Sequence, residues 1–103
     1  MPHRLLCTGN EAELLQSRCA VLRYAGYDAQ AATLPEAEIL LRAGKCELVI
    51  ISAHLSEWER GRIISAAGKT PTYVLRGLKL APDLVAQVDR LLLRVNHTAP
   101  SER

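Results

Sequence analysis

The sequence contains no phenylalanine, and aromatic residues make up only 4% of it, with a single tryptophan. Its core must therefore be built from Leu, Ile, Val and Ala. It has no apolar run near the roughly 18 residues that a membrane-spanning helix needs. Its first residues, MPHRLLCTGN, include neither a long apolar stretch nor a small-residue cleavage site, so no secretory signal is expected. We therefore expect a cytoplasmic protein that is not associated with a membrane.

The cysteine content and the net charge are also low. Cys7, Cys19 and Cys46 are widely spaced, which fits neither a disulfide framework nor a CxxC metal site. We expect them to be small hydrophobic residues in a reducing compartment. The net charge is +2 and the ten arginines are spread along the chain, so nucleic-acid binding is not expected.

The remaining composition is that of one small globular domain, with 49% apolar and 23% charged residues. We expect this domain to cover residues 1–95. The sequence pattern fades after Val95, and residues 96–103 are expected to form a flexible tail.

Four short apolar runs alternate with segments of helical periodicity. Asn10 is the expected cap of the first helix, and Thr33-x-x-Glu36 and Ser56-x-x-Glu59 are capping-box patterns ahead of the next two. The predicted strands are residues 4–8, 27–32, 48–51 and 72–75. The predicted helices follow them and end at Gly26, Gly44, Gly68 and near residue 95. This alternation is typical of a parallel sheet covered by helices on both faces.

Apolar spacing also predicts which side of each helix is buried. The expected buried positions are Leu14, Leu15, Arg18 (by its aliphatic stem), Cys19, Leu22 and Ala25 in the first helix; Ile39, Leu40 and Ala43 in the second; Ile63, Ile64 and Ala67 in the third; and Leu84, Val85, Val88, Leu91, Leu92 and Val95 in the last.

In a parallel sheet of this kind, ligands bind at the carboxyl ends of the strands, where the strand order reverses. The residues expected at this rim are Gly9-Asn10-Glu11, Thr33, Ser52-Ala53-His54 and Arg76-Gly77. The strongest strand, ELVIIS, ends there at Ser52.

Three segments, LRYAGYDAQAA, EILLRAGKCELVIIS and GKTPTYVLRG, resemble response-regulator receiver domains, and the resemblance covers residues 4–95. It implies a three-layer α/β/α flavodoxin-like fold whose four parallel strands lie in the order 2-1-3-4. The stretch between Arg76 and Pro82 is too short for a further helix and strand. The last helix-strand unit of a receiver is therefore expected to be missing.

A typical receiver holds Mg²⁺ with two acidic residues after its first strand and accepts phosphoryl on an aspartate that ends its third strand. It also has a Ser or Thr after the fourth strand and a Lys after the fifth. Here Gly9 and Asn10 stand at the acidic pair, Ser52 at the aspartate and Arg76 at the Ser/Thr position. Glu11 alone keeps a carboxylate nearby, and Lys79 aligns poorly with the lysine.

The resemblance thus implies a degenerate receiver: a non-catalytic signalling and interaction module of a phosphorelay type of system that does not itself accept phosphoryl. A hydroxyl with no base or metal is a poor nucleophile, so Ser52 is expected to cap its strand and bond a neighbouring loop. No catalytic residue, metal or cofactor is expected, and the protein partner is not identified by the sequence.

An alternative function rests on Cys7. LLCTGN resembles the start of the low-molecular-weight tyrosine phosphatase loop, and a sugar-phosphotransferase IIB subunit also carries a phosphorylated cysteine after its first strand. A phosphate-binding loop would wrap its N–H groups around the Cys7 sulfur. Glu13, six residues further on, would repel phosphate, so we expect Cys7 to be buried strand packing.

Two features of the sequence are relevant to protein binding. Trp58, flanked by Glu57 and Glu59, is expected to be partly exposed, either as a contact anchor or packed against Leu55. Without a fifth strand, the fourth becomes an exposed edge. We therefore expect a homodimer through the fourth strand and the last helix, with Tyr73, Val74, Leu75, Leu92 and Leu93 as the candidate interface.

Overall fold

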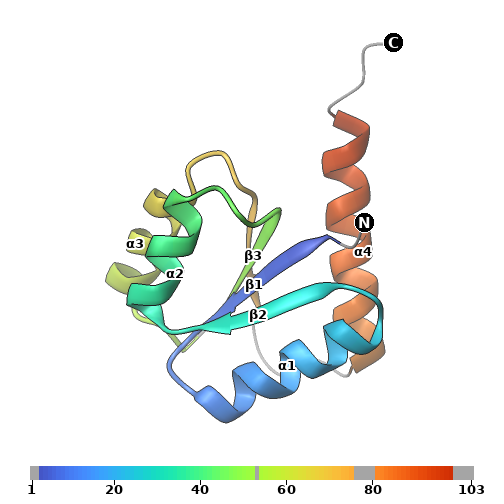
Figure 1. Ribbon diagram of the computed structural model, residues 1–103, viewed down its shortest axis with the longest axis horizontal. Coiled ribbons are helices and arrows are strands. Elements are labelled where there is room, and N and C mark those ends of the chain that lie inside the picture. Colours follow the sequence, from blue (N-terminus) through green and yellow to red (C-terminus); the bar gives the residue numbers. More distant parts are fainter. Residues whose placement is uncertain (1–2, 53, 76–80, 99–103) are drawn as a thin grey trace.

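The computed structural model describes residues 3–52, 54–75 and 81–98 of the chain. Strands and helices alternate along it (Figure 1). The strands are β1 (Arg4–Thr8), β2 (Asp28–Ala32), β3 (Leu48–Ser52) and β4 (Thr72–Leu75), and the helices are α1 (Ala12–Tyr24), α2 (Leu34–Arg42), α3 (Glu57–Ala67) and α4 (Ala81–Thr98). All eight predicted elements are present, and each strand boundary lies within one residue of its prediction.

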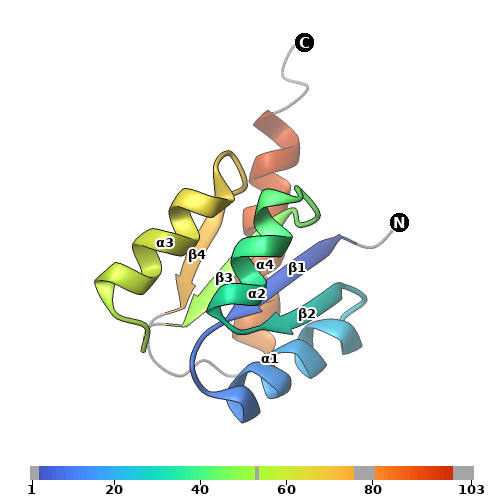
Figure 2. The same ribbon diagram turned by 60° about the vertical axis from the view of Figure 1, so that its left-hand side comes forward.

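The four strands form one parallel sheet in the order β2-β1-β3-β4, which confirms the predicted fold class. Helices α1 and α4 cover one face of this sheet, and α2 and α3 cover the other (Figures 1 and 2). The two central strands, β1 and β3, therefore have helices on both sides. This explains why β3 is buried at all five of its positions.

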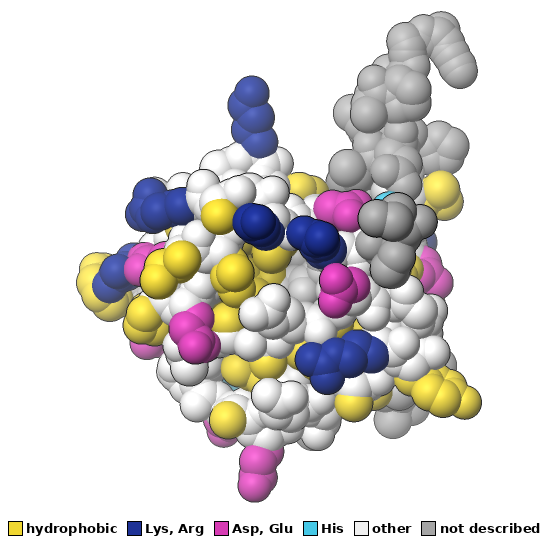
Figure 3. Space-filling view, in the orientation of Figure 1, with side chains coloured by type: hydrophobic (Ala, Val, Ile, Leu, Met, Phe, Trp, Pro, Cys, Tyr) yellow, Lys and Arg dark blue, Asp and Glu magenta, His cyan; other side chains and the backbone are white. Residues whose placement is uncertain are grey.

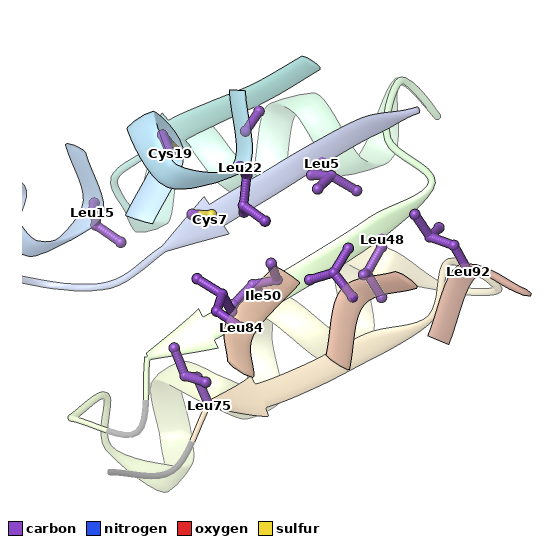
Figure 4. Packing of buried hydrophobic residues seen from close by; sticks show 12 residues of the cluster. Leu5, Cys7, Leu15, Cys19, Leu22, Leu48, Ile50, Leu75, Leu84 and Leu92 are labelled. Carbon is purple, nitrogen blue, oxygen red and sulfur yellow. The ribbon is translucent and has the colours of Figure 1, made fainter. Parts of the chain in front are cut away.

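The sheet separates two hydrophobic cores. Along β3, Leu48 and Ile50 face α1 and α4, whereas Val49 and Ile51 face α2 and α3. Figure 4 shows the first of these, the α1–α4 core. Its helical members are Leu15, Cys19, Leu22, Leu84, Val88 and Leu92. The α2–α3 core is made from Leu6, Ala32, Ala37, Leu41, Val49, Ile51, Leu55, Ile63, Ala66 and Ala67.

The predicted buried face of α2 is wrong. Ala37 and Leu41 are buried, whereas Ile39 is 69% exposed, Ala43 is exposed and Leu40 is half-buried. Six of the nine positions of this short helix are apolar, and they lie on more than one side of it, so periodicity does not single out one face. The direction in which the chain enters α2 from β2 decides which side meets the sheet.

The prediction for α3 is wrong at one position, Ile64, which is 49% exposed. Its neighbour Ile63 is buried together with Ala66 and Ala67. Two adjacent isoleucines on a helix point about 100° apart, so only one of them can lie at the centre of the buried face. Ala66 and Ala67 fill the rest of the buried face of α3 with small side chains.

Both predicted capping boxes are present. The Glu36 carboxylate accepts hydrogen bonds from the backbone N–H and the hydroxyl of Thr33, at 3.1 and 3.2 Å. At α3, Ser56 and Glu59 exchange bonds reciprocally, at 2.9 and 3.1 Å. These side chains satisfy backbone groups that a helix start leaves without partners.

The ends of the first and last helices differ from prediction. At α1 the cap position is occupied by Glu11, not Asn10, and Glu11 makes no side-chain capping bond. At its other end Ala25 is exposed, because it follows the last helical residue. Helix α4 continues to Thr98, so residues 96–98 of the predicted tail are helical. No residue there breaks a helix, and the next proline in the sequence is Pro100.

Several predicted positions lie outside the described residues: Ala53, Arg76, Gly77, Lys79, the side chain of Val95 and the tail residues 99–103. Within the described part of the chain, no helix combines the length and the apolar character needed to span a membrane.

Candidate functional site

The candidate site is the rim formed by the carboxyl ends of β1 and β3. The chain passes from β1 to β2 on one side and returns to β3 on the other, so the strand order reverses between β1 and β3. The loops that follow Thr8 and Ser52 therefore meet at the position where sheets of this class bind ligands.

At this rim Gly9 lies directly against Ser52. A Cβ atom added to Gly9 would lie 2.7 Å from the Ser52 Cβ, a distance that real Cβ atoms essentially never show. Gly9 is itself buried. Gly9 and Ser52 are thus in contact, with no space between them for a side chain at position 9.

The hydroxyl of Ser52 is engaged within its own loop. Ser52 is 4% exposed, and its Oγ accepts a hydrogen bond from the backbone N–H of His54 at 3.3 Å. This matches the expectation that Ser52 caps the strand and bonds a loop. His54 supplies that bond from its backbone, and its side chain is exposed. No contact between the His54 imidazole and the Ser52 hydroxyl is found among the described residues.

The acidic and amide groups near this rim do not form a metal site. Asn10 and Glu11 are both exposed. The pKa of the Glu59 carboxyl at the start of α3 is lowered by the backbone N–H of Ser56, and further by the Ser56 and Asn10 side chains. Mg²⁺ prefers several oxygen ligands, usually with more than one negative charge. The described rim residues do not fit this requirement, because Glu59 is used for capping and the Asn10 amide that bonds it carries no charge.

Two threonines, Thr8 and Thr33, lie at the same edge of the sheet, and neither hydroxyl is free to bind a ligand. Thr33 bonds Glu36 at the start of α2. Thr8, the last residue of β1, is completely buried, and its Oγ1 has no hydrogen-bond partner among the described residues. Sequence reasoning missed Thr8 because a threonine that ends a strand usually reaches solvent or a loop. A buried hydroxyl without a partner is expected to cost about 1–3 kcal/mol of stability.

Cys7 lies within the sheet, not in a loop. It pairs with Ala31 of β2 on one side and with Ile50 of β3 on the other, and it is 0% exposed. Figure 4 shows it in the α1–α4 core beneath the α1 residue Cys19. Hydrogen bonding with Cys19, together with burial, raises the pKa of the Cys7 thiol. The predicted burial of Cys7 is confirmed, and the thiol is neither accessible nor activated as a nucleophile.

The candidate interface residues fall into three groups. Leu75 and Leu92 are buried in the α1–α4 core, at 2% and 4% exposure, so they are not part of any surface. Tyr73 and Val74 are half-buried. Leu93 is 56% exposed.

Among the described residues, no group of three or more His, Cys, Asp or Glu side chains is placed to hold a metal ion.

The fold is shared with known receiver domains. A CheY-like response-regulator receiver domain protein from Methanospirillum hungatei superposes with a TM-score of 0.63 and 15% identity, over 91% of this chain and 96% of that one. The signal receiver domain of a protein described as a Luxo repressor, from Vibrio parahaemolyticus, superposes with a TM-score of 0.66 and 17% identity, over 100% of this chain and 99% of that one.

A designed protein has a similar fold. A de novo designed Rossmann-fold protein superposes with a TM-score of 0.53 and 16% identity, over 88% of this chain and 97% of that one. No protein-family model matches the sequence, and no curated protein does. At these identities the comparisons show the fold alone, since a fold can host many functions or none. The chain is thus a four-stranded α/β protein with a receiver-like fold.

Proposed function

We propose that the chain is a receiver-like interaction module of a phosphorelay type of signalling system, one that binds protein partners but does not accept phosphoryl itself. The receiver-like fold supports the signalling class. The contact between Gly9 and Ser52 supports the second part of the proposal.

That contact matters because phosphoryl transfer to a receiver requires a carboxylate nucleophile and a metal held beside it. Here the nucleophile position carries a hydroxyl that accepts a bond from His54, and the position of the first acidic ligand has no side chain. At the position of the second acidic ligand, Asn10 supplies a neutral amide in place of a carboxylate. Restoring one group alone would not rebuild the site.

The alternative function, phosphoryl transfer through Cys7, is not supported by the geometry. The sulfur would have to leave the interior of the sheet to reach a phosphate donor, because Cys7 is completely buried between two paired strands. A protonated, buried thiol is inert.

The direct test is incubation of the chain with acetyl phosphate and Mg²⁺, followed by intact-mass spectrometry. A receiver domain with its complete acidic set, treated in parallel, shows that the donor is active. We expect no mass increase in this chain. A stable gain of one phosphoryl group that disappears in Ser52→Ala or Cys7→Ser would refute the proposal and locate the acceptor.

A further inference from the structure

A groove between α2 and α3 has the character of a protein-binding surface. Its volume is about 400 Å³, and it is lined by Glu38, Arg42, Trp58, Gly61, Arg62 and Ser65. Trp58, the single tryptophan of the chain, is 67% exposed. Figure 3 shows hydrophobic side chains gathered on the side of the molecule where α2 and α3 lie, with Lys or Arg side chains along the upper border.

The indole of Trp58 is held in position. The Arg62 guanidinium carbon lies 5.0 Å from the ring centroid, which places a cation over one face of the ring. The same guanidinium donates two hydrogen bonds to the Glu38 carboxylate, at 2.7 and 2.6 Å. Glu38 is largely buried, with 14% of its side chain exposed. A partner that binds this indole would therefore lose little conformational entropy in ordering it.

A glycine forms part of the groove without serving the fold. Gly61 lies inside α3, where glycine costs about 0.5–1 kcal/mol relative to alanine. A Cβ atom at this position would meet nothing within 4 Å. No internal contact requires glycine there. The groove instead presents bare helix backbone beside Trp58, which suits a segment that approaches from outside the chain.

The charge of the groove indicates what that segment carries. The positive charge of Arg62 is neutralised by its two bonds to Glu38. Arg42 is exposed, and no carboxylate among the described residues forms an ion pair with it. The groove thus offers one uncompensated guanidinium next to an aromatic face, and its complement is a carboxylate next to an apolar side chain.

We propose that the α2–α3 groove docks a partner protein through a short acidic and apolar segment. A carboxylate of this segment pairs with Arg42, an apolar side chain lies on the open face of Trp58, and its backbone passes over Gly61. The proposal rests on the function proposed above, because it names the surface through which the module binds its partners.

The test starts from a displayed library of random peptides, about a dozen residues long, selected against the full chain. We expect enriched peptides that combine Asp or Glu with a large apolar residue at a fixed spacing. Synthetic copies should shift the fluorescence of Trp58, which reports on the groove directly. A library that enriches no peptide, or peptides without acidic residues, would overturn the proposal.

Two variants locate the binding. Arg42→Glu should weaken the affinity for the selected peptides at least tenfold, because removal of an interface anchor causes a loss of this size. Gly61→Leu should block the groove while leaving the fold intact, since a side chain at that position meets open space. Arg90→Glu, an exposed arginine on α4 across the sheet, is the matched control and should bind normally.

The outcome separates this inference from the proposed function. A second groove, between α1 and α4, is lined by Ala20, Val21, Tyr24, Ala25, Val85, Ala86 and Asp89. If the selected peptides bind Arg42→Glu and Gly61→Leu normally but are lost in Tyr24→Ala, the inference is wrong and the module binds through that other face. The acetyl phosphate experiment tests separately whether the chain accepts phosphoryl, and its result does not depend on which groove binds the peptides.

Discussion

The hydroxyl of Tyr27 donates a hydrogen bond to the carboxylate of Asp89, and so connects the residue before β2 to the middle of α4. The two residues are 62 positions apart in the sequence. Helix α4 makes few contacts with α1. Its outer end extends beyond the sheet (Figure 1). This bond therefore helps to fix the position of the last helix relative to the first half of the chain.

Loss of the tyrosine hydroxyl should loosen α4. We expect Tyr27→Phe to lower the free energy of unfolding by about 0.5–1.5 kcal/mol, the usual value of one hydrogen bond. Urea denaturation followed by far-ultraviolet circular dichroism measures this. Tyr24→Phe is the matched control, because Tyr24 is 96% exposed, and it should leave stability unchanged.

The same pair predicts a response to alkali. Burial and the bond to Asp89 raise the pKa of Tyr27 from 10.0 to about 12. The folded state thus favours the neutral phenol, and this stabilisation is complete below pH 10 and lost as the pH rises to about 12. The difference in stability between wild type and Tyr27→Phe should shrink over this window. A difference that stays constant with pH would show that the bond does not depend on the phenol proton.

The capping box of α3 should weaken in acid. The pKa of Glu59 is lowered, chiefly by the backbone N–H of Ser56, so its contribution to stability is present above its ordinary value of 4.5. That contribution is lost as the pH falls through the lower value of the folded state. We expect Glu59→Gln to reduce the melting temperature at pH 7 more than at pH 3. Glu57→Gln, in the same turn, should show no such change.

Two glycine-to-alanine substitutions should act in opposite directions. Gly9→Ala forces a Cβ atom against Ser52 and should destabilise the fold by about 1–3 kcal/mol, the usual cost of overpacking. Gly61→Ala meets open space inside a helix and should stabilise it by about 0.5–1 kcal/mol. Chemical denaturation of both variants measures these two changes in the free energy of unfolding. A stable Gly9→Ala would mean that the two loops at the rim can separate.

Self-association through β4 and α4 is a further prediction. Among the described residues β4 pairs only with β3, so its other edge is open to a second copy. Leu93 lies 56% exposed on α4. We expect light scattering at micromolar concentration to give twice the monomer mass, and Leu93→Glu to return it to one. A wild-type protein that stays monomeric at the highest attainable concentration would exclude this dimer.

Most of the fold was predictable because its signals are local. Gly26, Gly44 and Gly68 all follow helix ends with positive φ, at 102°, 68° and 58°, a conformation that other residues rarely adopt. The capping boxes and the apolar run of β3 are equally local. The strand order followed from the resemblance to receivers, and not from any one segment.

The candidate site was predictable in its residues but not in its contacts. Gly9 and Ser52 are 43 positions apart, and no local pattern shows that they touch. The exposure of Ile39 could not be predicted for the same reason, because it depends on how α2 lies on the sheet and not on a local pattern. It also explains Trp58, whose exposure was expected but whose partners, Arg62 and Glu38, come from the packing of α3 on α2.

Neither of the two cores contains a buried aromatic ring among the described residues, and the sequence has no phenylalanine. Ring currents from aromatic side chains are what normally spread the methyl resonances of a folded protein. The methyl groups of residues such as Leu6, Val49 and Ile51 have no ring beside them within the α2–α3 core. The methyl resonances of the α2–α3 core should therefore fall in a narrow range, like those of a loosely packed chain, whereas Tyr27 and Tyr73, which pack against the α1–α4 core, should spread the methyl resonances there. The amide protons of β1 and β3 should nevertheless exchange slowly with solvent.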